Sequence, residues 1–361
     1  MRLAEIVAAR PLVGEGVLVM LTRRCPLRCA HCATMSTMSA PHADAGVLRR
    51  FFDTFTVDSH PAVAVLTGGE PLLRPALVTE LAAAARSAGT RTAVLTGAFF
   101  ATAARIPAPV RRVAAAVDHF SISLDAYHER EVPRASVFRV LRELIELGVA
   151  VSLHVVGAGP DDPYLADATA DVRRCFGTQV PMLVTGLRAT GRAASWASPA
   201  IPAPGAAAAE PCAMAAWPVV TDDGTITACC NQNVVDGVAR PEHLRLGHAT
   251  VDGWPAVRER TRSSPVLRML RTLGPRGLDA RVAADGGWPA ADYCGTCERL
   301  GRRPEVLAWA RANAAGPGGA LLDRQAAHGQ ADAGPTALVR RYGCAPYADL
   351  VDLDRDREPS R

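Results

Sequence analysis

Short apolar runs alternate with stretches of helical spacing about six times between residues 17 and 184, and this alternation constrains the fold most. The runs are uninterrupted, as expected for strands that are buried on both faces of a parallel sheet. They cover residues 17–22, 62–67, 92–96, 119–124, 151–156 and 180–184. Helical spacing fills the intervals, over residues 47–55, 75–88, 110–116, 137–147 and 164–175. The order predicts an α/β protein with a parallel sheet and right-handed crossovers, and leaves open whether the sheet closes.

Length and composition limit the number of domains and the kinds of partner that the chain can have. The chain has 361 residues, 49% of them hydrophobic, which is enough for one large domain and a smaller one. Its net charge of +4 is too small to indicate nucleic acid or a membrane as a partner. The first residues lack the pattern of a signal peptide, and no apolar run reaches eighteen residues, so we expect a cytoplasmic protein. In such a reducing compartment its ten cysteines are expected to bind metals rather than form disulfides.

Three cysteines follow the first apolar run with the spacing CxxxCxxC: Cys25, Cys29 and Cys32. Three thiolates so close together can hold one iron-sulfur cluster from a single loop and leave its fourth iron without a protein ligand. A structural zinc site is the alternative, but it needs four ligands, and His31 is badly placed between two of the cysteines to complete it. A disulfide is disfavoured by the odd count and the tight spacing.

This spacing resembles that of the radical SAM enzymes, and the resemblance extends from about residue 15 to about residue 195. It implies a partial TIM-like barrel of six βα units and a [4Fe-4S] cluster whose open iron is chelated by S-adenosylmethionine. An electron from the cluster, supplied by an external donor such as flavodoxin or ferredoxin, then cleaves the cofactor and frees a 5′-deoxyadenosyl radical.

Two further strand ends match motifs of the same family. Gly68, Gly69 and Glu70 follow the second apolar run, about forty residues after the cysteines, where relatives hold the amino group of the cofactor. Alone, such a triplet could equally be a turn before a helix. Ser123 and Asp125 match the family's Ser-Leu-Asp element, which contacts the cofactor or the substrate, although ordinary turn chemistry at a strand end would look the same.

Less specific signals point to three further places in the core. Arg134 occupies the place of an arginine that pairs with the cofactor carboxylate in relatives, and Arg130 is its rival. His154, inside the fifth apolar run, is either a substrate contact in the barrel lumen or a hydrogen-bonded core histidine. Gly191-Arg192-Ala193 resembles the segment that closes the core in relatives with extra clusters.

The remaining cysteines predict a second, smaller α+β domain. Cys212 and Cys229 flank two β-rich runs joined by Asp-Asp-Gly, which reads as a hairpin, and Cys294 and Cys297 can add a second pair from a turn. Four thiolates hold one auxiliary [4Fe-4S] cluster, as in the SPASM domain or its shorter twitch form, which this region resembles. A zinc ribbon is the alternative. Cys230 could replace Cys229, and Cys344 could displace one of the four.

The expected boundaries are a core over residues 1–195, a linker over 196–211, the auxiliary domain over 212–345 and a tail over 346–361. Through the resemblance, we expect oxidative maturation, by dehydrogenation or cross-linking, of a peptide or other natural product. An epimerase in which Cys175 or Cys344 returns a hydrogen atom is the alternative, and a non-catalytic iron-sulfur or zinc protein is the alternative of another class. Only twenty-four residues precede Cys25, so a leader peptide would need a separate binding protein.

Overall fold

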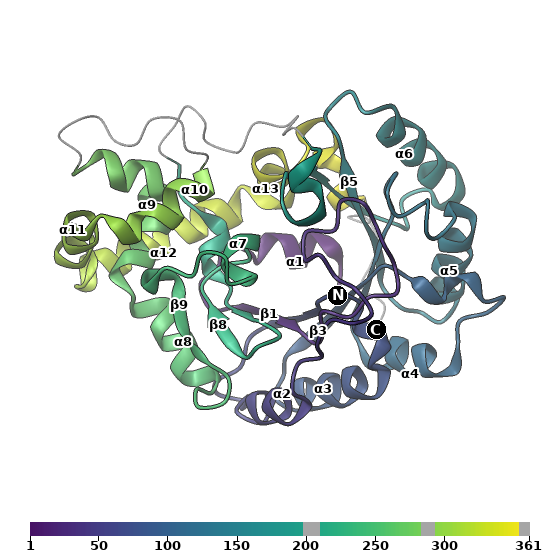
Figure 1. Cartoon of the computed structure of the whole chain (residues 1–361), viewed down its shortest axis with the longest axis horizontal. Helices are drawn as coiled ribbons and strands as arrows, with labels where there is room; N and C mark the ends of the chain where they lie inside the picture. The colour runs from purple at the N-terminus through teal and green to yellow at the C-terminus, as the bar shows by residue number, and fades with distance from the viewer. Residues whose placement is uncertain (198–209, 283–292, 354–361) are drawn as a thin grey trace.

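The computed structural model describes residues 1–197, 210–282 and 293–353 (Figure 1). Its centre is one sheet of nine strands in the order β6-β5-β4-β3-β2-β1-β7-β8-β9. The first six strands are parallel throughout: β1 (Gly16–Met20), β2 (Val63–Thr67), β3 (Arg91–Thr96), β4 (His119–Ser123), β5 (Val151–Gly157) and β6 (Met182–Gly186). Because β1 and β6 lie at opposite ends of this run and do not pair, the sheet is open. The α/β prediction is confirmed, and the core is a partial barrel.

Five helices cover one face of this sheet and form an arc around it in Figure 1. Alternate strand residues such as Val17, Val19 and Leu21 point to this face and pack against apolar helix residues such as Leu48 and Phe51. The helices are α2 (Ala45–Phe52), α3 (Pro75–Ser87), α4 (Ala108–Ala116), α5 (Arg134–Glu146) and α6 (Pro163–Phe176). The six strands and five helices predicted from apolar spacing are therefore present, with ends that differ by a few residues.

The opposite face of the sheet is covered by segments from both halves of the chain. Leu18, Val63 and Val65 point to this face and cluster with Ile6 and the fully buried Trp217. The elements that cover it are α1 (Leu3–Ala8), α13 (Gly334–Tyr342) and the 3-10 helix η7 (Ala345–Asp352), which contact one another. The segment from residue 346, expected to be a tail, thus begins as a helix against β6, and residues 354–361 lie outside the described residues.

A hairpin extends the sheet beyond β1. β7 (Val219–Val220) is parallel to β1, and β8 (Thr225–Thr227) and β9 (Arg245–His248) follow in antiparallel order. Gly224 in the Asp-Asp-Gly turn has a φ of +85°, a conformation that favours glycine. The predicted hairpin is therefore present, and it belongs to the same sheet as the first six strands. Residues 198–209 of the expected linker lie outside the described part of the chain.

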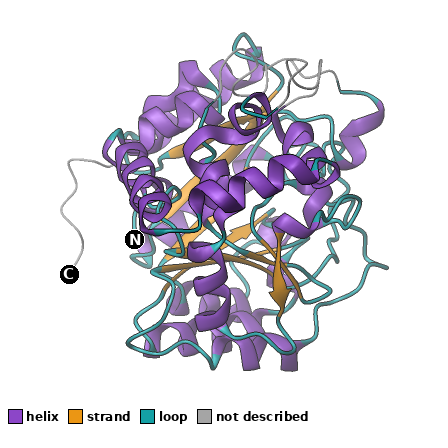
Figure 2. Ribbon diagram, turned by 90° about the vertical axis from the view of Figure 1, so that its left-hand side faces the viewer, coloured by secondary structure: helices purple, strands orange, loops and turns teal. Residues whose placement is uncertain are grey.

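The rest of the second half is mainly helical, whereas only a small α+β domain was predicted there. α9 packs against α8, α10, α11 and α12, and Figure 2 shows helices on both sides of the strands. α9 is kinked at Gly274, where the φ is +72° and an added Cβ would lie 1.8 Å from the carbonyl oxygen of Glu210. The bounds are α7 (Gln232–Val235), α8 (Trp254–Ser263), α9 (Pro265–Ala280), α10 (Tyr293–Arg299), α11 (Pro304–Ala314) and α12 (Pro317–Asp332).

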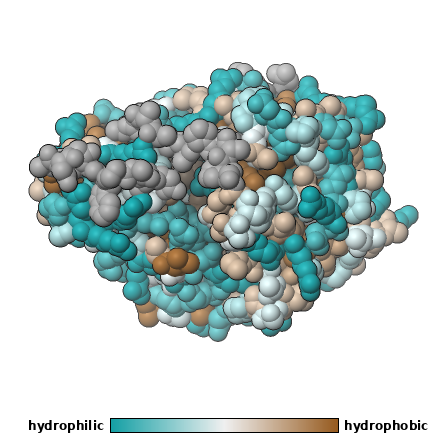
Figure 3. Space-filling view, turned by 45° about the horizontal axis from the view of Figure 1, so that its top comes forward, coloured by the Kyte–Doolittle hydropathy of each residue, from teal (hydrophilic) through white to brown (hydrophobic). Residues whose placement is uncertain are grey.

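The surface is mixed in character. On the face seen in Figure 3, small groups of apolar side chains are interspersed with hydrophilic ones. Among the described helices, none combines the length and the apolar character that crossing a membrane requires.

Candidate active site

The loop that carries Cys25, Cys29 and Cys32 leaves the carboxyl end of β1, where catalytic loops gather in sheets of this kind. All three thiols are free, Cys29 is buried, and the other two are half-buried. Burial raises the pKa of Cys25 to about 12, so this thiol would lose its proton only on binding a metal. Three free thiols in one short loop fit the donor set that an iron-sulfur cluster requires.

The glycine pair after β2 packs against the backbone of this cysteine loop. The N–H of Gly69 donates to the carbonyl oxygen of Thr22 at 2.7 Å, and the N–H of Glu70 donates to that of Arg24 at 2.8 Å. An added Cβ on Gly68 would lie 2.3 Å from the Thr22 oxygen, and one on Gly69 would lie 2.4 Å from the Arg24 oxygen. The glycines are therefore needed for the close approach of two loops, and the predicted approach to a ligand stays a prediction.

The Glu70 carboxylate is fully buried at the same edge and is already well hydrogen-bonded. It accepts from the hydroxyl of Thr96 at 2.8 Å, the N–H of Gly97 at 3.0 Å and the N–H of Leu72 at 2.9 Å. Burial outweighs these donors and raises the pKa of Glu70 to about 7. The side chain thus joins the loops after β2 and β3.

Asp125, just beyond β4, lies between two histidines. Its Oδ2 is 2.8 Å from Nδ1 of His128 and 3.3 Å from Nε2 of His31. Burial disfavours the carboxylate, but His128 and His31 outweigh that cost and hold the pKa of Asp125 well below its usual range. His128 also interacts with Cys29, so the predicted Asp125 and the cysteine loop are in one cluster. Sequence reasoning missed His128, although it lies three residues after Asp125.

The other predicted side chains near β4 and β5 are placed as follows. Ser123 is the half-buried last residue of β4. Arg134 begins α5, and its guanidinium is paired with the three carboxylates of Glu129, Asp167 and Asp171. His154 lies 3.3 Å from the Thr185 hydroxyl, and burial lowers the pKa of its imidazole to about 4. His154 is thus a half-buried, hydrogen-bonded histidine, and its contact with a substrate and the cofactor role of Arg134 both stay predictions.

The segment after β6 contacts the cysteine loop directly. The N–H of Arg192 donates to the carbonyl oxygen of Cys32 at 3.0 Å, and its guanidinium donates to two further carbonyls of the loop. Gly191 has a φ of +56°, and an added Cβ would lie 2.2 Å from the carbonyl oxygen of Ala33. The Gly-Arg-Ala segment recognised in the sequence therefore holds the cysteine loop.

Aromatic and apolar side chains border the site on its solvent side. Trp196 is 47% exposed, and its ring lies 5.5 Å from that of Tyr127, which in turn stacks on His31 at 4.7 Å. Met35 and Met38, just after the cysteine loop, are 60% and 53% exposed. Large exposed apolar groups are thus gathered next to the three cysteines.

A second set of thiols converges between the hairpin and α10. Burial raises the pKa of Cys297 well above its ordinary value, and the neighbouring thiols of Cys229, Cys212 and Cys294 raise it further. Cys294 and Cys297 lie one turn apart on α10, where a turn was predicted; this i, i+3 spacing on a helix places both thiols on one face. Four free thiols gathered in one place, with Cys229 buried and the other three half-buried, fit the donor set of a metal centre.

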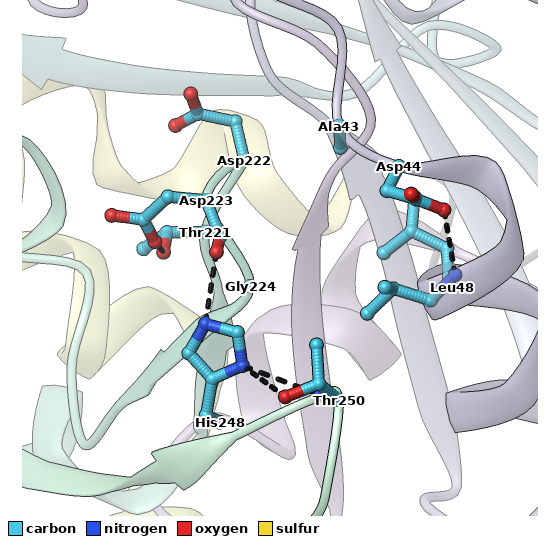
Figure 4. A pocket seen from close by; sticks show the side chains of 10 residues that line it. Ala43, Asp44, Leu48, Thr221, Asp222, Asp223, Gly224, His248 and Thr250 are labelled. Atoms are coloured by element: carbon cyan, nitrogen blue, oxygen red, sulfur yellow. Dashed lines mark hydrogen bonds between the residues drawn. The ribbon is translucent and has the colours of Figure 1, made fainter.

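Arg23 links the loop after β1 to the β7–β8 turn and to the end of α7. Its guanidinium donates to Asp222 at 2.6 Å in the β7–β8 turn and to Asp236 at 2.5 Å after α7. A pocket of about 50 Å³ lies beside this link, between the turn and the start of α2 (Figure 4). The pocket is far smaller than the roughly 300 Å³ of the smallest usual ligand sites, so it is no substrate site.

Two cysteines lie away from both sets. Cys175 is in the last turn of α6, which runs antiparallel to the strands and so ends at the opposite edge of the sheet from the cysteine loop. Cys344 is 1% exposed, and its N–H donates to the carbonyl oxygen of Val184 in β6. The structure does not bring Cys175 to the candidate site.

Residues 19–171 match the family model of the Radical SAM superfamily. The match covers the cysteine loop, the glycine pair and Asp125, so the chain contains a radical SAM domain.

Among curated proteins, the chain is 40% identical over 117 residues to the PqqA peptide cyclase of Ruegeria pomeroyi. The match covers 30% of this chain and 28% of that protein. Among solved structures, native anSMEcpe with bound AdoMet matches with 12% identity and a TM-score of 0.47, over 82% of this chain and 99% of that one. Streptococcus suis SuiB bound to precursor peptide SuiA matches with 12% identity and a TM-score of 0.47, over 75% of this chain and 70% of that one.

Proposed function

We propose that this chain is a radical SAM oxidoreductase that matures a peptide or other natural product. The observation that supports this most is the cluster at the carboxyl edge of the sheet. There the backbone of the loop that carries the three free thiols contacts the loop of the glycine pair after β2, and the Cys29 thiol contacts His128 of the Asp125 network after β4.

Cys25, Cys29 and Cys32 would hold the [4Fe-4S] cluster, which supplies the electron that cleaves S-adenosylmethionine. The chain's own residues would position that cofactor. Gly68, Gly69 and Glu70 form the loop proposed to hold its amino group, and Ser123 and Asp125 are proposed contacts to its other polar groups. Arg134 would have to exchange one of its three carboxylate partners to bind the cofactor carboxylate.

Cys212, Cys229, Cys294 and Cys297 would hold one auxiliary [4Fe-4S] cluster, which supplies an acceptor for the electron left on the substrate. This acceptor makes the net reaction an oxidation. The convergence of these four thiols, of which Cys229 is buried and the other three are half-buried, supports this assignment. Cys344 interacts with Asp162 rather than with these thiols, which supports leaving it out of the ligand set.

A peptide is the substrate class that we favour. The relative with 40% identity over 117 residues is named a peptide cyclase, and the exposed Trp196, Met35 and Met38 offer apolar contacts to a peptide beside the cysteines. An external donor such as flavodoxin or ferredoxin would supply electrons, and a separate protein would bind any leader segment. We place this chemistry in the cytoplasm, because a reducing compartment preserves ten free cysteines.

Iron and labile sulfide per chain, measured after anaerobic reconstitution, test both metal centres. We expect about eight irons in the intact chain and about four in the Cys25/Cys29/Cys32→Ala variant. The intact chain should form 5′-deoxyadenosine under strong reductant, and the variant should not. A variant that still cleaves the cofactor would refute the proposal, and an intact chain that cleaves none would favour a non-catalytic metal protein.

Product analysis in heavy water separates oxidation from epimerisation. We expect a product without a solvent-derived deuterium at the attacked carbon. One such deuterium, together with lost turnover but intact cofactor cleavage in Cys175→Ala or Cys344→Ala, would instead identify an epimerase.

A further inference from the structure

The guanidinium of Arg10, just after α1, contacts two sulfur atoms from the second half of the chain. Its Nη2 donates to Sγ of Cys230 at 3.7 Å and to Sδ of Met214 at 3.5 Å. Its guanidinium also lies over the ring of Trp217, 4.7 Å from the centroid. These contacts join the N-terminal segment to the cysteine-rich region, more than 200 residues away along the chain.

The placement of Arg10 is enforced by its surroundings. Trp217 is fully buried, and its Nε1 donates to the carbonyl oxygen of Ala9 at 3.0 Å. Gly16 leaves room for the indole, because an added Cβ there would lie 2.2 Å from the ring. Trp217 thus fixes Arg10 in two ways: it binds the backbone of the preceding residue, and its ring lies under the guanidinium. A side chain so constrained loses little further entropy when it binds sulfur.

Cys230 lies at the edge of the four-thiol set rather than inside it. It is an electrostatic neighbour of Cys212 and Cys229. Cys229 and Cys297 pack in the main hydrophobic cluster, whereas Cys230 packs against a separate cluster formed by Met20, Val219 and Val235. Cys230 therefore packs apart from Cys229 and Cys297, and its sulfur atom contacts Arg10.

We propose that Arg10 is a positioning residue of the auxiliary metal centre: its guanidinium holds Cys230 outside the ligand set and raises the reduction potential of the auxiliary [4Fe-4S] cluster. This inference rests on the proposed function, which assigns a cluster to the four thiols. Reduction adds one electron, and so one negative charge, to a centre that already carries four thiolates. A fixed positive charge nearby favours the reduced form, and a half-buried site screens that charge less than water does. Arg10 thus makes the centre a better electron acceptor.

A redox titration of the auxiliary centre alone tests this. The Cys25/Cys29/Cys32→Ala chain serves as the parent, and Arg10→Gln, Arg10→Lys and the control Arg2→Gln are added to it. Arg2 lies on the same N-terminal segment but pairs with Glu5. Iron content is measured first, and the midpoint potential is then followed by EPR.

We expect about four irons in every variant and a more negative midpoint potential in Arg10→Gln. A roughly 10-fold shift in the reduction equilibrium corresponds to about 59 mV for one electron. Arg10→Lys, which keeps the charge, should recover part of the shift, and Arg2→Gln should show none. If Arg10 has only a structural role, Arg10→Gln should lower the stability of the chain and leave the midpoint potential unchanged. That result, with about four irons still bound, would overturn the role of Arg10 but not the proposed auxiliary cluster.

Cys230→Ala gives a second test that does not depend on the Arg10 variants folding. Iron should stay at about four if Cys230 is outside the ligand set, and a loss of iron would overturn that part of the inference. A parent chain that binds no iron would refute the auxiliary cluster itself, and the inference with it. The two failures are therefore distinguishable.

Discussion

The Nε of Arg192 donates a hydrogen bond to the carbonyl oxygen of Cys29 at 2.9 Å across 163 residues of sequence. Its Nη1 donates to the carbonyl oxygen of Ser36 at 2.8 Å. Arg192 follows β6 and the cysteine loop follows β1, the two strands at opposite ends of the parallel run. These bonds thus connect the carboxyl edge of the partial barrel across its open side, where no strand pairing does so.

Arg192→Gln should loosen the loop that is proposed to hold the radical SAM cluster. Each charge-assisted hydrogen bond contributes about 1.5–3 kcal/mol, so losing two leaves the loop poorly held. We expect slower cofactor cleavage and faster iron loss during dialysis against a chelator, with the auxiliary irons retained. Arg188→Gln, at an exposed position on the same segment, is the matched control. Equal iron retention in both variants would contradict the role given to Arg192.

Gly69→Ala should damage the same loop from the other side. The added methyl would lie 2.4 Å from the Arg24 carbonyl oxygen and 2.8 Å from that of Arg23, both backbone atoms that cannot move aside cheaply. We expect a stability loss of about 1–3 kcal/mol, typical of overpacking, and a lower iron content after reconstitution. Denaturant unfolding measures the stability loss. Gly318→Ala, where nothing lies within 4 Å of the new methyl, should be close to neutral.

The ion pair of Arg271 and Asp323 should be important for the stability of the helical second half. The two side chains are only 2% and 6% exposed, and two hydrogen bonds of 2.8 and 2.7 Å join them. Asp323→Ala leaves a buried, unpaired guanidinium, so we expect a loss of about 3–5 kcal/mol in unfolding free energy. The control is Glu80→Ala, which breaks the half-exposed pair with Arg49 and should cost at most about 1 kcal/mol. Similar losses in the two variants would show that burial does not govern these pairs.

The sequence was most informative where residues act locally. Uninterrupted apolar runs predicted all six parallel strands, because strands buried on both faces carry no polar alternation. The hairpin between Cys212 and Cys229 was predicted because Asp-Asp-Gly is a local turn signal. The motifs after β1, β2 and β4 were placed at one edge by the parallel topology, which brings the carboxyl ends of the strands together.

Contacts between distant segments were not predictable from the sequence. Arg10 meets Cys230, and Arg23 meets Asp222 and Asp236, only after the second half has folded against the first. The helices α8 to α12 were not predicted individually, because only a small α+β domain was expected from the cysteines of this region. Within them, the charge of the buried Arg271 is neutralised by a carboxylate 52 residues away. The spacing of residues in a sequence does not indicate such pairs between distant positions.

The stability of the fold should fall in mild acid because of His119. Its ring is 1% exposed, with Nδ1 3.0 Å from the Met1 carbonyl oxygen and Nε2 2.8 Å from the Ser152 hydroxyl. Burial lowers the pKa of His119 to about 4, below its ordinary 6.5. The unfolded chain therefore binds a proton in a pH range where the folded chain does not. The contribution to stability is complete above pH 6.5 and is lost as the pH falls towards 4.

Comparison of the wild type with His119→Gln isolates this contribution, because the other titrating groups are common to both chains. We expect the wild type to lose about 2–3 kcal/mol more than the variant between pH 7 and pH 4.5. Urea unfolding of the metal-free chains at several pH values measures it, and His328→Gln, at an exposed position of α12, is the matched control. Parallel stability curves for the wild type and His119→Gln would show that the buried ring takes up its proton without unfolding, for example by exchanging Ser152 for water as its partner.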